Sequence, residues 1–132
     1  MRDISDAADL MTTAREALLS ELLAALPKER RYVGLMIANA MAIAAREHRL
    51  GADAARSEAG RLRNLLVTIG VPAESASDVG IASDLSALRK SICAAIRAGR
   101  FDDPALERTL AAELMHTTQD WVAISNPKAL RT

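Results

Sequence analysis

Glu113 and His116 are the pair of residues in this chain whose types and spacing come nearest to those of metal ligands. A Glu-x-x-His spacing puts a carboxylate and an imidazole on one helix face, as in carboxylate-bridged di-iron bundles. Such a centre needs a second pair of this kind and two more carboxylates, whereas the other histidine, His48, directly follows Glu47. Asp120 lies four residues after His116, a spacing at which polar side chains pair on exposed helix surfaces. We therefore predict surface pairing here and no metal site.

Cys93 is the single cysteine, and its surroundings offer no help to a nucleophile. A reactive thiolate needs a base or a cation that lowers the thiol pKa, whereas the sequence SICAAIRAG is mostly small and apolar. Packing in a helix face is the favoured role for this residue. The chain has no Gly-rich phosphate loop either, so the sequence predicts neither a catalytic residue nor a cofactor.

Arginine supplies all of the basic residues except Lys28, Lys90 and Lys128. Its planar fork of donors suits carboxylates and phosphates. Arg30 and Arg31 fall in the first turn of an expected helix, where free backbone N–H groups also favour an anion. The alternative is that both side chains cover apolar surface and pair with a nearby acid. Whether an anion binds stays open for four residues: Arg30, Arg31, Arg46 and Arg97.

Asn39 is the one strongly polar residue in the run from Val33 to Ala45, which contains no charge. A buried side-chain amide that lacks partners costs on the order of 1–3 kcal/mol. Tyr32 and Arg46 each lie seven residues away, on roughly the same helix face. A hydrogen-bonded tie between helices is the favoured interpretation, and a side chain that faces a ligand or a partner is the alternative.

The uncharged run itself predicts the buried central helix of an all-helical domain. Its thirteen residues are fewer than the roughly 20 that cross a bilayer, so we predict no membrane span. The N-terminal segment carries Asp3, Asp6 and Asp9 where a secretion signal needs basic and then apolar residues. Together with the lone cysteine, this favours an untargeted protein of the reducing cytoplasm.

Five helices follow from apolar periodicity and from the residues that end helices. Pro27 separates the first two, Gly51 is expected to cap the second, and Ser83 and Asp103 are expected to begin the last two. The segment from Gly70 to Ser83 is expected to form a loop, and loops of this length often bind something. The predicted helices span residues 5–26, 27–50, 52–69, 84–98 and 104–124.

Composition agrees with this reading, because half of the residues are hydrophobic and only 2% are aromatic. Such a core is made of Ala, Leu, Ile, Val and Met, which favours close-packed helices over sheets. We predict a single all-α domain over residues 1–132, a bundle of four to five helices with mostly antiparallel neighbours. The 17 basic and 17 acidic residues balance and form no long block, so neither nucleic acid nor an anionic membrane is an expected partner.

Several segments, in this order, resemble a small bacterial all-helical family of unknown function: LLAALP at residues 22–27, Tyr32, IANAMAIAARE at 37–47, LRKSICAAIRAGRFD at 88–102, and a terminal Asn126-Pro127. Members are commonly encoded beside aminoglycoside-phosphotransferase-like kinases and acyl-CoA dehydrogenases. The resemblance singles out Tyr32, Asn39, Arg46, Glu47, Arg97, Asn126 and Pro127. The chain departs from the family pattern at Leu35, where an arginine is common, and at Ser125, where an acid is common.

The resemblance implies a non-catalytic accessory or activating partner of a phosphotransferase-like kinase that acts on hydroxyacyl-CoA or a related small hydroxylated substrate. Its expected partner-facing or ligand-facing residues are Tyr32, Asn39, Arg46, Glu47, Arg97 and Asn126. One alternative is a small helical enzyme or binding protein in which Arg15, Arg46, Glu47 and Arg97 hold an anionic metabolite. Another is a helical bundle that associates with copies of itself as a homo-oligomer.

Overall fold

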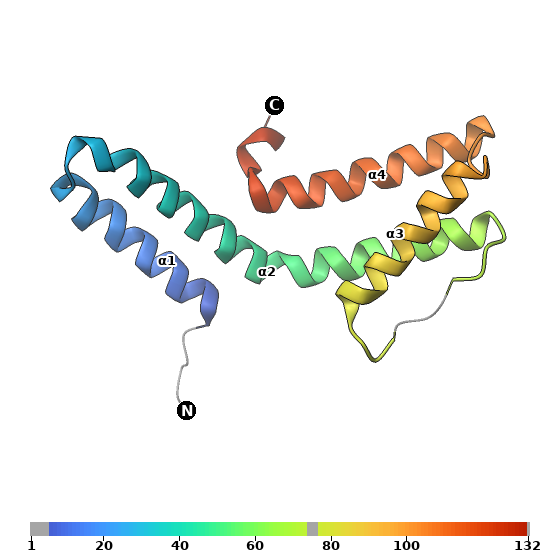
Figure 1. Cartoon of the computed structure of the whole chain (residues 1–132), viewed down its shortest axis with the longest axis horizontal. Coiled ribbons are helices and arrows are strands. Elements are labelled where there is room, and N and C mark those ends of the chain that lie inside the picture. Colours follow the sequence, from blue (N-terminus) through green and yellow to red (C-terminus); the bar gives the residue numbers. More distant parts are fainter. Residues whose placement is uncertain (1–5, 74–76, 132) are drawn as a thin grey trace. The chain divides into compact units, whose positions relative to one another are not determined.

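The computed structural model describes residues 6–73 and 77–131, and within these ranges the chain is all-α, as predicted. It contains four α-helices, α1 (Ala7–Ala17), α2 (Arg31–Thr68), α3 (Ile81–Arg97) and α4 (Pro104–Ser125), and no strand in the described part (Figure 1). Shorter turns follow α1 and α4: a π-helix (Leu18–Leu22) and 3₁₀ turns at Leu23–Ala25, Lys28–Arg30 and Pro127–Leu130. The predicted start of the first helix at Ser5 lies outside the described residues.

The chain divides into two compact units. Unit 1 comprises Met1–Ala52 and Ile124–Thr132, and unit 2 comprises Asp53–Ala123. Helix α2 contributes its first part to unit 1 and its second part to unit 2. The prediction of one domain over residues 1–132 stays a prediction.

The predicted break in α2 was wrong, because one helix runs from Arg31 to Thr68 without interruption. Gly51 was expected to end a helix in the left-handed conformation, but it is not among the glycines with positive φ. It is buried inside α2, and the Glu47 carboxylate lies closer to the position of an added β-carbon than a normal contact allows. A glycine costs a helix only about 1 kcal/mol, which the continuous hydrogen-bond ladder and packing on both sides outweigh.

Of the other two residues expected to begin helices, Asp103 does so and Ser83 does not. Asp103 caps α4, because its Oδ2 accepts from the N–H groups of Ala105 and Leu106 at 3.0 and 3.2 Å. Gly99 follows α3 with φ of 75°, the left-handed conformation that glycine adopts without strain. The prediction that Ser83 caps a helix was wrong, because α3 begins at Ile81, three residues earlier than the predicted start. Gly80, with φ of 117°, directly precedes it.

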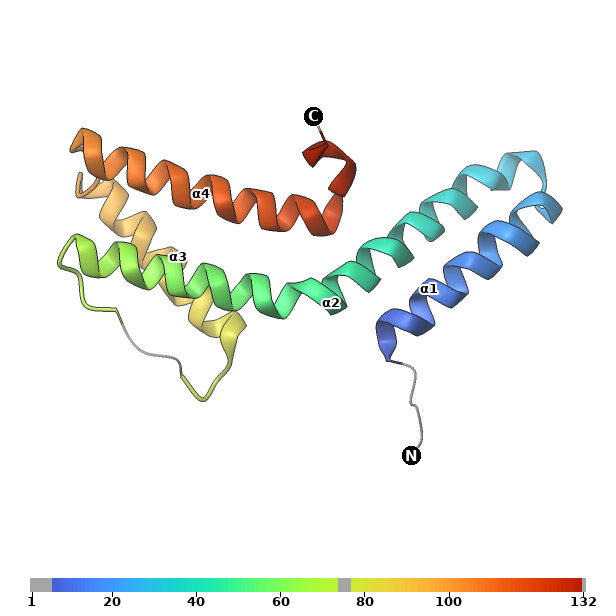
Figure 2. The same ribbon diagram turned by 180° about the vertical axis from the view of Figure 1, so that it is seen from behind.

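Unit 2 contains the main hydrophobic core, formed where the second part of α2 packs with α3 and α4 (Figure 2). Apolar side chains three and four residues apart on each helix point into it, which explains why these segments are amphipathic. Trp121 of α4 is half-buried in the same unit. The buried core residues include Leu62, Leu65, Leu66, Leu85, Leu88, Ile92, Phe101 and Leu110.

Unit 1 is built mainly from a hairpin in which α1 lies antiparallel to the first part of α2 (Figure 1). Its described buried hydrophobic residues are small except for one: Ala8, Ala38, Ala45 and Ile124. The expectation that the run from Val33 to Ala45 forms a buried central helix was therefore wrong for much of its length. The reason is that α1 covers one face of this helix and leaves others exposed.

Candidate functional site

The first part of α2 carries three parallel rows of residues, each with spacings of four, three and four. The inner row is Gly34, Ala38, Met41 and Ala45. The apolar flank is Val33, Ile37, Ala40 and Ala44. The outer row is Tyr32, Met36, Asn39 and Ile43. Because each residue advances about 100° around a helix, the flank lies about 100° from the inner row and the outer row lies nearly opposite it.

The inner row faces α1 and the turns that follow it. A β-carbon added at Gly34 would stand 3.0 Å from Leu23 Cδ1 and 3.1 Å from Leu26 Cδ1, so any larger residue would require these leucine side chains to shift. The Nε of Arg15 in α1 donates to the backbone carbonyl of Ala38 at 3.1 Å. The packing of Leu23 and Leu26 against Gly34 and the hydrogen bond from Arg15 therefore help to hold the hairpin together, and an ion pair of 3.3 Å between Arg49 and Asp9 also joins its two helices.

The outer row and the flank are largely exposed to solvent. Tyr32 is 72% exposed and Met36 56%, while Val33 and Ile37 of the flank are 47% and 46% exposed. A helix that is apolar on several sides is normally buried on those sides, and contiguous exposed apolar surface usually marks an interaction site. No helix in the described ranges meets the length and hydropathy needed to span a bilayer. This surface is the strongest candidate functional site.

Asn39 stands in the outer row and is exposed, so the expected tie between helices was wrong. Its amide can be hydrated by water and carries no desolvation penalty in the isolated chain. The alternative interpretation, a side chain that faces a partner, fits its position beside Met36 and Tyr32. Two of the residues singled out by the family resemblance, Tyr32 and Asn39, thus lie in one exposed row.

Arg46, Glu47 and Asn126 also belong to unit 1. The Nε of Arg46 donates to the carbonyl of Ile124 at 2.6 Å, in the last turn of α4, where helix carbonyls lack internal partners. Asn126 is exposed and immediately precedes the 3₁₀ turn Pro127–Leu130, and Glu47 is exposed on α2. Arg46 therefore has a structural contact that the sequence did not predict.

Arg97 lies in unit 2, exposed at the end of α3. It lines a shallow hollow of about 380 Å³ together with Lys90, Arg89 and Cys93. The prediction that Cys93 packs in a helix face was wrong, because its side chain is exposed on the outer side of α3. The buried face of α3 is formed instead by Leu85, Leu88, Ile92 and Ala95.

Glu113, His116 and Asp120 form part of an ion-pair cluster centred on Arg61 of α2. Arg61 Nε lies 3.1 Å from Glu113 Oε2, and its Nη2 lies 3.3 Å from Asp120 Oδ2. His116 Nε2 is 3.9 Å from the same Asp120 oxygen. The cluster ties α4 to α2, beyond the pairing within one helix that the sequence suggested. In the described ranges, no group of three or more His, Cys, Asp or Glu is placed to hold a metal ion.

A second tie joins α2 to α3 through Glu58, whose side chain is almost completely buried. Its two carboxylate oxygens accept from Arg89 Nε and Nη2 at 2.8 and 2.7 Å. This paired geometry raises the pKa of Arg89 through the hydrogen bonds to Glu58. Without the guanidinium the buried carboxylate would be unpaired, so the contact fixes how the two helices pack.

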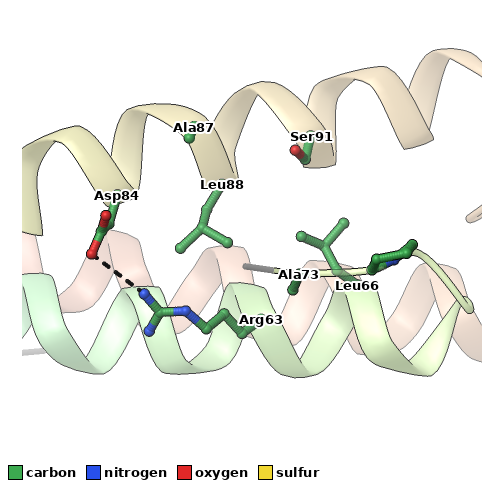
Figure 3. Close-up of a pocket in the computed structure, with 8 residues that line it drawn as sticks. Arg63, Leu66, Ala73, Asp84, Ala87, Leu88 and Ser91 are labelled. Atoms are coloured by element: carbon green, nitrogen blue, oxygen red, sulfur yellow. Dashed lines mark ion pairs between the residues drawn. The ribbon is translucent and has the colours of Figure 1, made fainter. Parts of the chain in front are cut away.

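A hollow of about 220 Å³ lies in unit 2 between α2 and α3 (Figure 3). Leu66, Leu88 and Ala73 give it an apolar lining, and Arg63 and Asp84 stand at one end as an ion pair of 3.6 Å. Asp84 also accepts from the hydroxyl and backbone N–H of Ser77 at 2.5 and 3.1 Å. The Oδ2 atom of Asp84, which accepts from the Ser77 N–H, also faces the Arg63 guanidinium, so one negative and one positive charge stand together at this end of the hollow.

The sequence did not predict the contacts of Arg61, Glu58 and Asp84. Each joins residues that are separated by at least 21 positions or lie across a loop, as in Arg63 with Asp84 and Glu58 with Arg89. Helical spacing relates only residues three or four apart. The sequence carries no signal that would have paired them.

The comparisons with known proteins place the chain in a family without assigning it an activity. No curated protein and no solved structure matches the sequence. A family model described as a domain of unknown function (DUF6285) matches residues 24–129, which include all of α2, α3 and α4 and thus the outer row, the flank and both interhelix ties. The chain therefore belongs to the family defined by this domain of unknown function.

Proposed function

We propose that this chain is a non-catalytic accessory subunit that binds a phosphotransferase-like kinase through the outer row of α2. The observation that carries the proposal is the exposure of Tyr32, Met36 and Asn39 side by side on one helix face. Aromatic residues and methionine are enriched in the centres of protein interfaces, where a few anchors supply most of the binding energy.

The kinase is inferred from the resemblance, in which genes for such kinases commonly lie beside those of the family. It would act on hydroxyacyl-CoA or a related small hydroxylated substrate in the bacterial cytoplasm. Tyr32 and Asn39, two residues that the resemblance singles out, fall in the proposed contact. The Asn39 amide supplies a polar group that fixes the register of an otherwise apolar contact.

The structure of unit 1 supports this proposal over an anion-binding enzyme. Two of the arginines that the enzyme hypothesis requires are engaged with backbone carbonyls: Arg15 with Ala38, and Arg46 with Ile124. A site for an anionic metabolite needs guanidinium groups that converge on the ligand. A rigid helix face with apolar anchors is better suited to ordering a lobe of a partner protein.

The test is co-purification of the tagged full-length chain from its native host, followed by affinity measurement with the recovered kinase. We expect near-equal amounts of the two proteins. Met36→Glu should weaken binding at least about 10-fold, because it places a charge in the apolar contact.

Val67→Glu is the matched control, since Val67 is 68% exposed on the same helix but lies in unit 2. It should leave the affinity within about twofold. Recovery of the chain without a kinase, or equal loss of affinity in both variants, would contradict the proposal.

A further inference from the structure

We propose that a second copy of this chain covers the apolar flank of α2, so that the two hairpins of unit 1 form a four-helix bundle. This inference concerns a different face of α2 from the kinase contact and does not depend on it. The proposal rests on the small number of fully buried large side chains in unit 1, on the direction of the flank and on its composition.

Unit 1 has few fully buried hydrophobic side chains, and most of its larger ones, such as Leu23, Leu26 and Met41, are half-buried or exposed. Its described buried hydrophobic side chains are those of Ala8, Ala38, Ala45 and Ile124. An alanine offers one methyl group to bury, whereas each of the exposed Val33 and Ile37 offers several carbons. Association is one of the ways in which a small unit of this kind gains stability. A second copy is always present at the concentration of the first, so it can provide the cover as the hairpin folds.

The direction of the flank fits a bundle of two hairpins. Four helices in a bundle stand at the corners of a square, so each has two neighbours at about a right angle. The inner row of α2 already faces α1, and the flank is displaced by one residue, or about 100°. The flank therefore points to where the next helix of a bundle stands, while the outer row with Tyr32 and Asn39 points away from the bundle.

The composition of the flank fits a helix–helix seam. The spacing of four, three and four keeps a row of side chains facing a partner helix, and the flank follows it. None of its residues is polar: Val33, Ile37, Ala40 and Ala44. The two alanines permit a close approach of helix axes. The outer row, in contrast, would bury a phenol and an amide, each of which needs a hydrogen-bond partner.

The size of the hairpin face is also adequate. From Arg31 to Ala52, α2 extends about 33 Å, and two helices side by side are about 20 Å wide. The resulting face of roughly 660 Å² approaches the area of about 800 Å² that each partner buries in a standard protein interface. A two-fold arrangement buries the same face on both copies.

Sedimentation velocity of the full-length chain over a 100-fold range of concentration tests this inference. We expect a mass twice the 14.1 kDa of one chain at the higher concentrations, and a thermal midpoint that rises with concentration. Ile37→Glu should raise the dissociation constant of the dimer more than about 100-fold, because each copy brings a charge into the seam.

Met36→Glu is the matched control, one residue away on the outer row, and should leave the dimer intact. A monomer mass at every concentration, with a constant thermal midpoint, would overturn the inference whether or not the variants fold. Dissociation by both variants, or by neither, would overturn the assignment of the seam to the flank. In the kinase-binding experiment, by contrast, Met36→Glu is the variant that should weaken binding.

Discussion

Asp84 connects three parts of unit 2 through one carboxylate. It accepts two hydrogen bonds from Ser77, pairs with Arg63 of α2, and belongs to the first turn of α3. The Ser77 hydroxyl is the largest cause that lowers the pKa of Asp84, followed by the Ser77 backbone N–H, with a smaller contribution from Arg63. All of these contacts favour the charged form over the protonated one.

The folded state should therefore lose stability at acid pH through Asp84. Its pKa is lower in the folded chain than in the unfolded chain, where it is about 3.9, so the stabilisation is complete above pH 4 to 5 and is lost as pH falls through the lowered value. Asp84→Asn should reduce the free energy of unfolding at pH 7, and its difference from the natural chain should shrink at pH 3. Urea unfolding at both pH values measures this difference.

Asp78→Asn is the control for Asp84, because Asp78 is an exposed acid of the same loop. It should change the free energy of unfolding by less than about 0.5 kcal/mol at either pH. A difference for Asp84→Asn that stays constant from pH 7 to pH 3 would show that the charge of Asp84 does not stabilise the fold.

Residue types indicated some contacts but not the pairing partners. Tyr32 and Asn39 were predicted to face a partner as one interpretation, and the structure places both on an exposed row. The sequence did not indicate that Glu58 is buried or paired, because its partner Arg89 is 31 positions away. A sequence does not distinguish a buried glutamate from an exposed one. Long-range pairs of this kind are fixed by tertiary packing, which helical spacing does not encode.

At the scale of helices, the glycines show which local signals can be trusted. Gly99 and Gly70 follow helices with φ of 75° and 74°, as expected of capping residues. Gly51 looked the same in the sequence but lies inside α2. A glycine signals only that a left-handed residue is permitted, and the packing of the residues on either side decides whether the helix stops.

Two alanine substitutions should therefore change stability in opposite directions. Gly60 lies inside α2, and a β-carbon added there would meet nothing within 4 Å, so Gly60→Ala should raise the free energy of unfolding by about 0.5–1 kcal/mol. Gly70 has positive φ, so Gly70→Ala should lower it by about 1–2 kcal/mol. Chemical denaturation of both variants measures the two changes. Stabilisation by both substitutions would contradict the assigned end of α2.

At the scale of the whole molecule, composition was enough to predict the class. A scarcity of aromatic residues and an abundance of Ala and Leu favoured helices, and the described part of the chain contains four α-helices and no strand. The distribution of the core was less predictable. Periodicity marks an apolar face but does not say whether the same chain or another molecule covers it, which is why Val33 and Ile37 were expected to be buried.

Hydrogen exchange should separate the two units. If a second copy covers the flank, amides of α1 and of residues 31–45 should exchange several-fold more slowly at 200 μM than at 2 μM, because association closes the hairpin. Core amides of α3 and of residues 62–66 should exchange at rates that do not depend on concentration. Mass spectrometry of peptic fragments measures both sets in one sample. Equal concentration dependence in the two units would show that association protects the whole chain and not the hairpin.

The chain contains one tryptophan and one tyrosine, and they fall in different units: Trp121 half-buried in unit 2 and Tyr32 exposed in unit 1. Each unit therefore has its own natural chromophore. Indole emission follows the surroundings of Trp121 on α4 in unit 2, whereas the ultraviolet difference absorbance of the phenol follows the solvent at the outer row. An optical titration without any attached dye can thus distinguish an event at the surface of the hairpin from a loosening of the core.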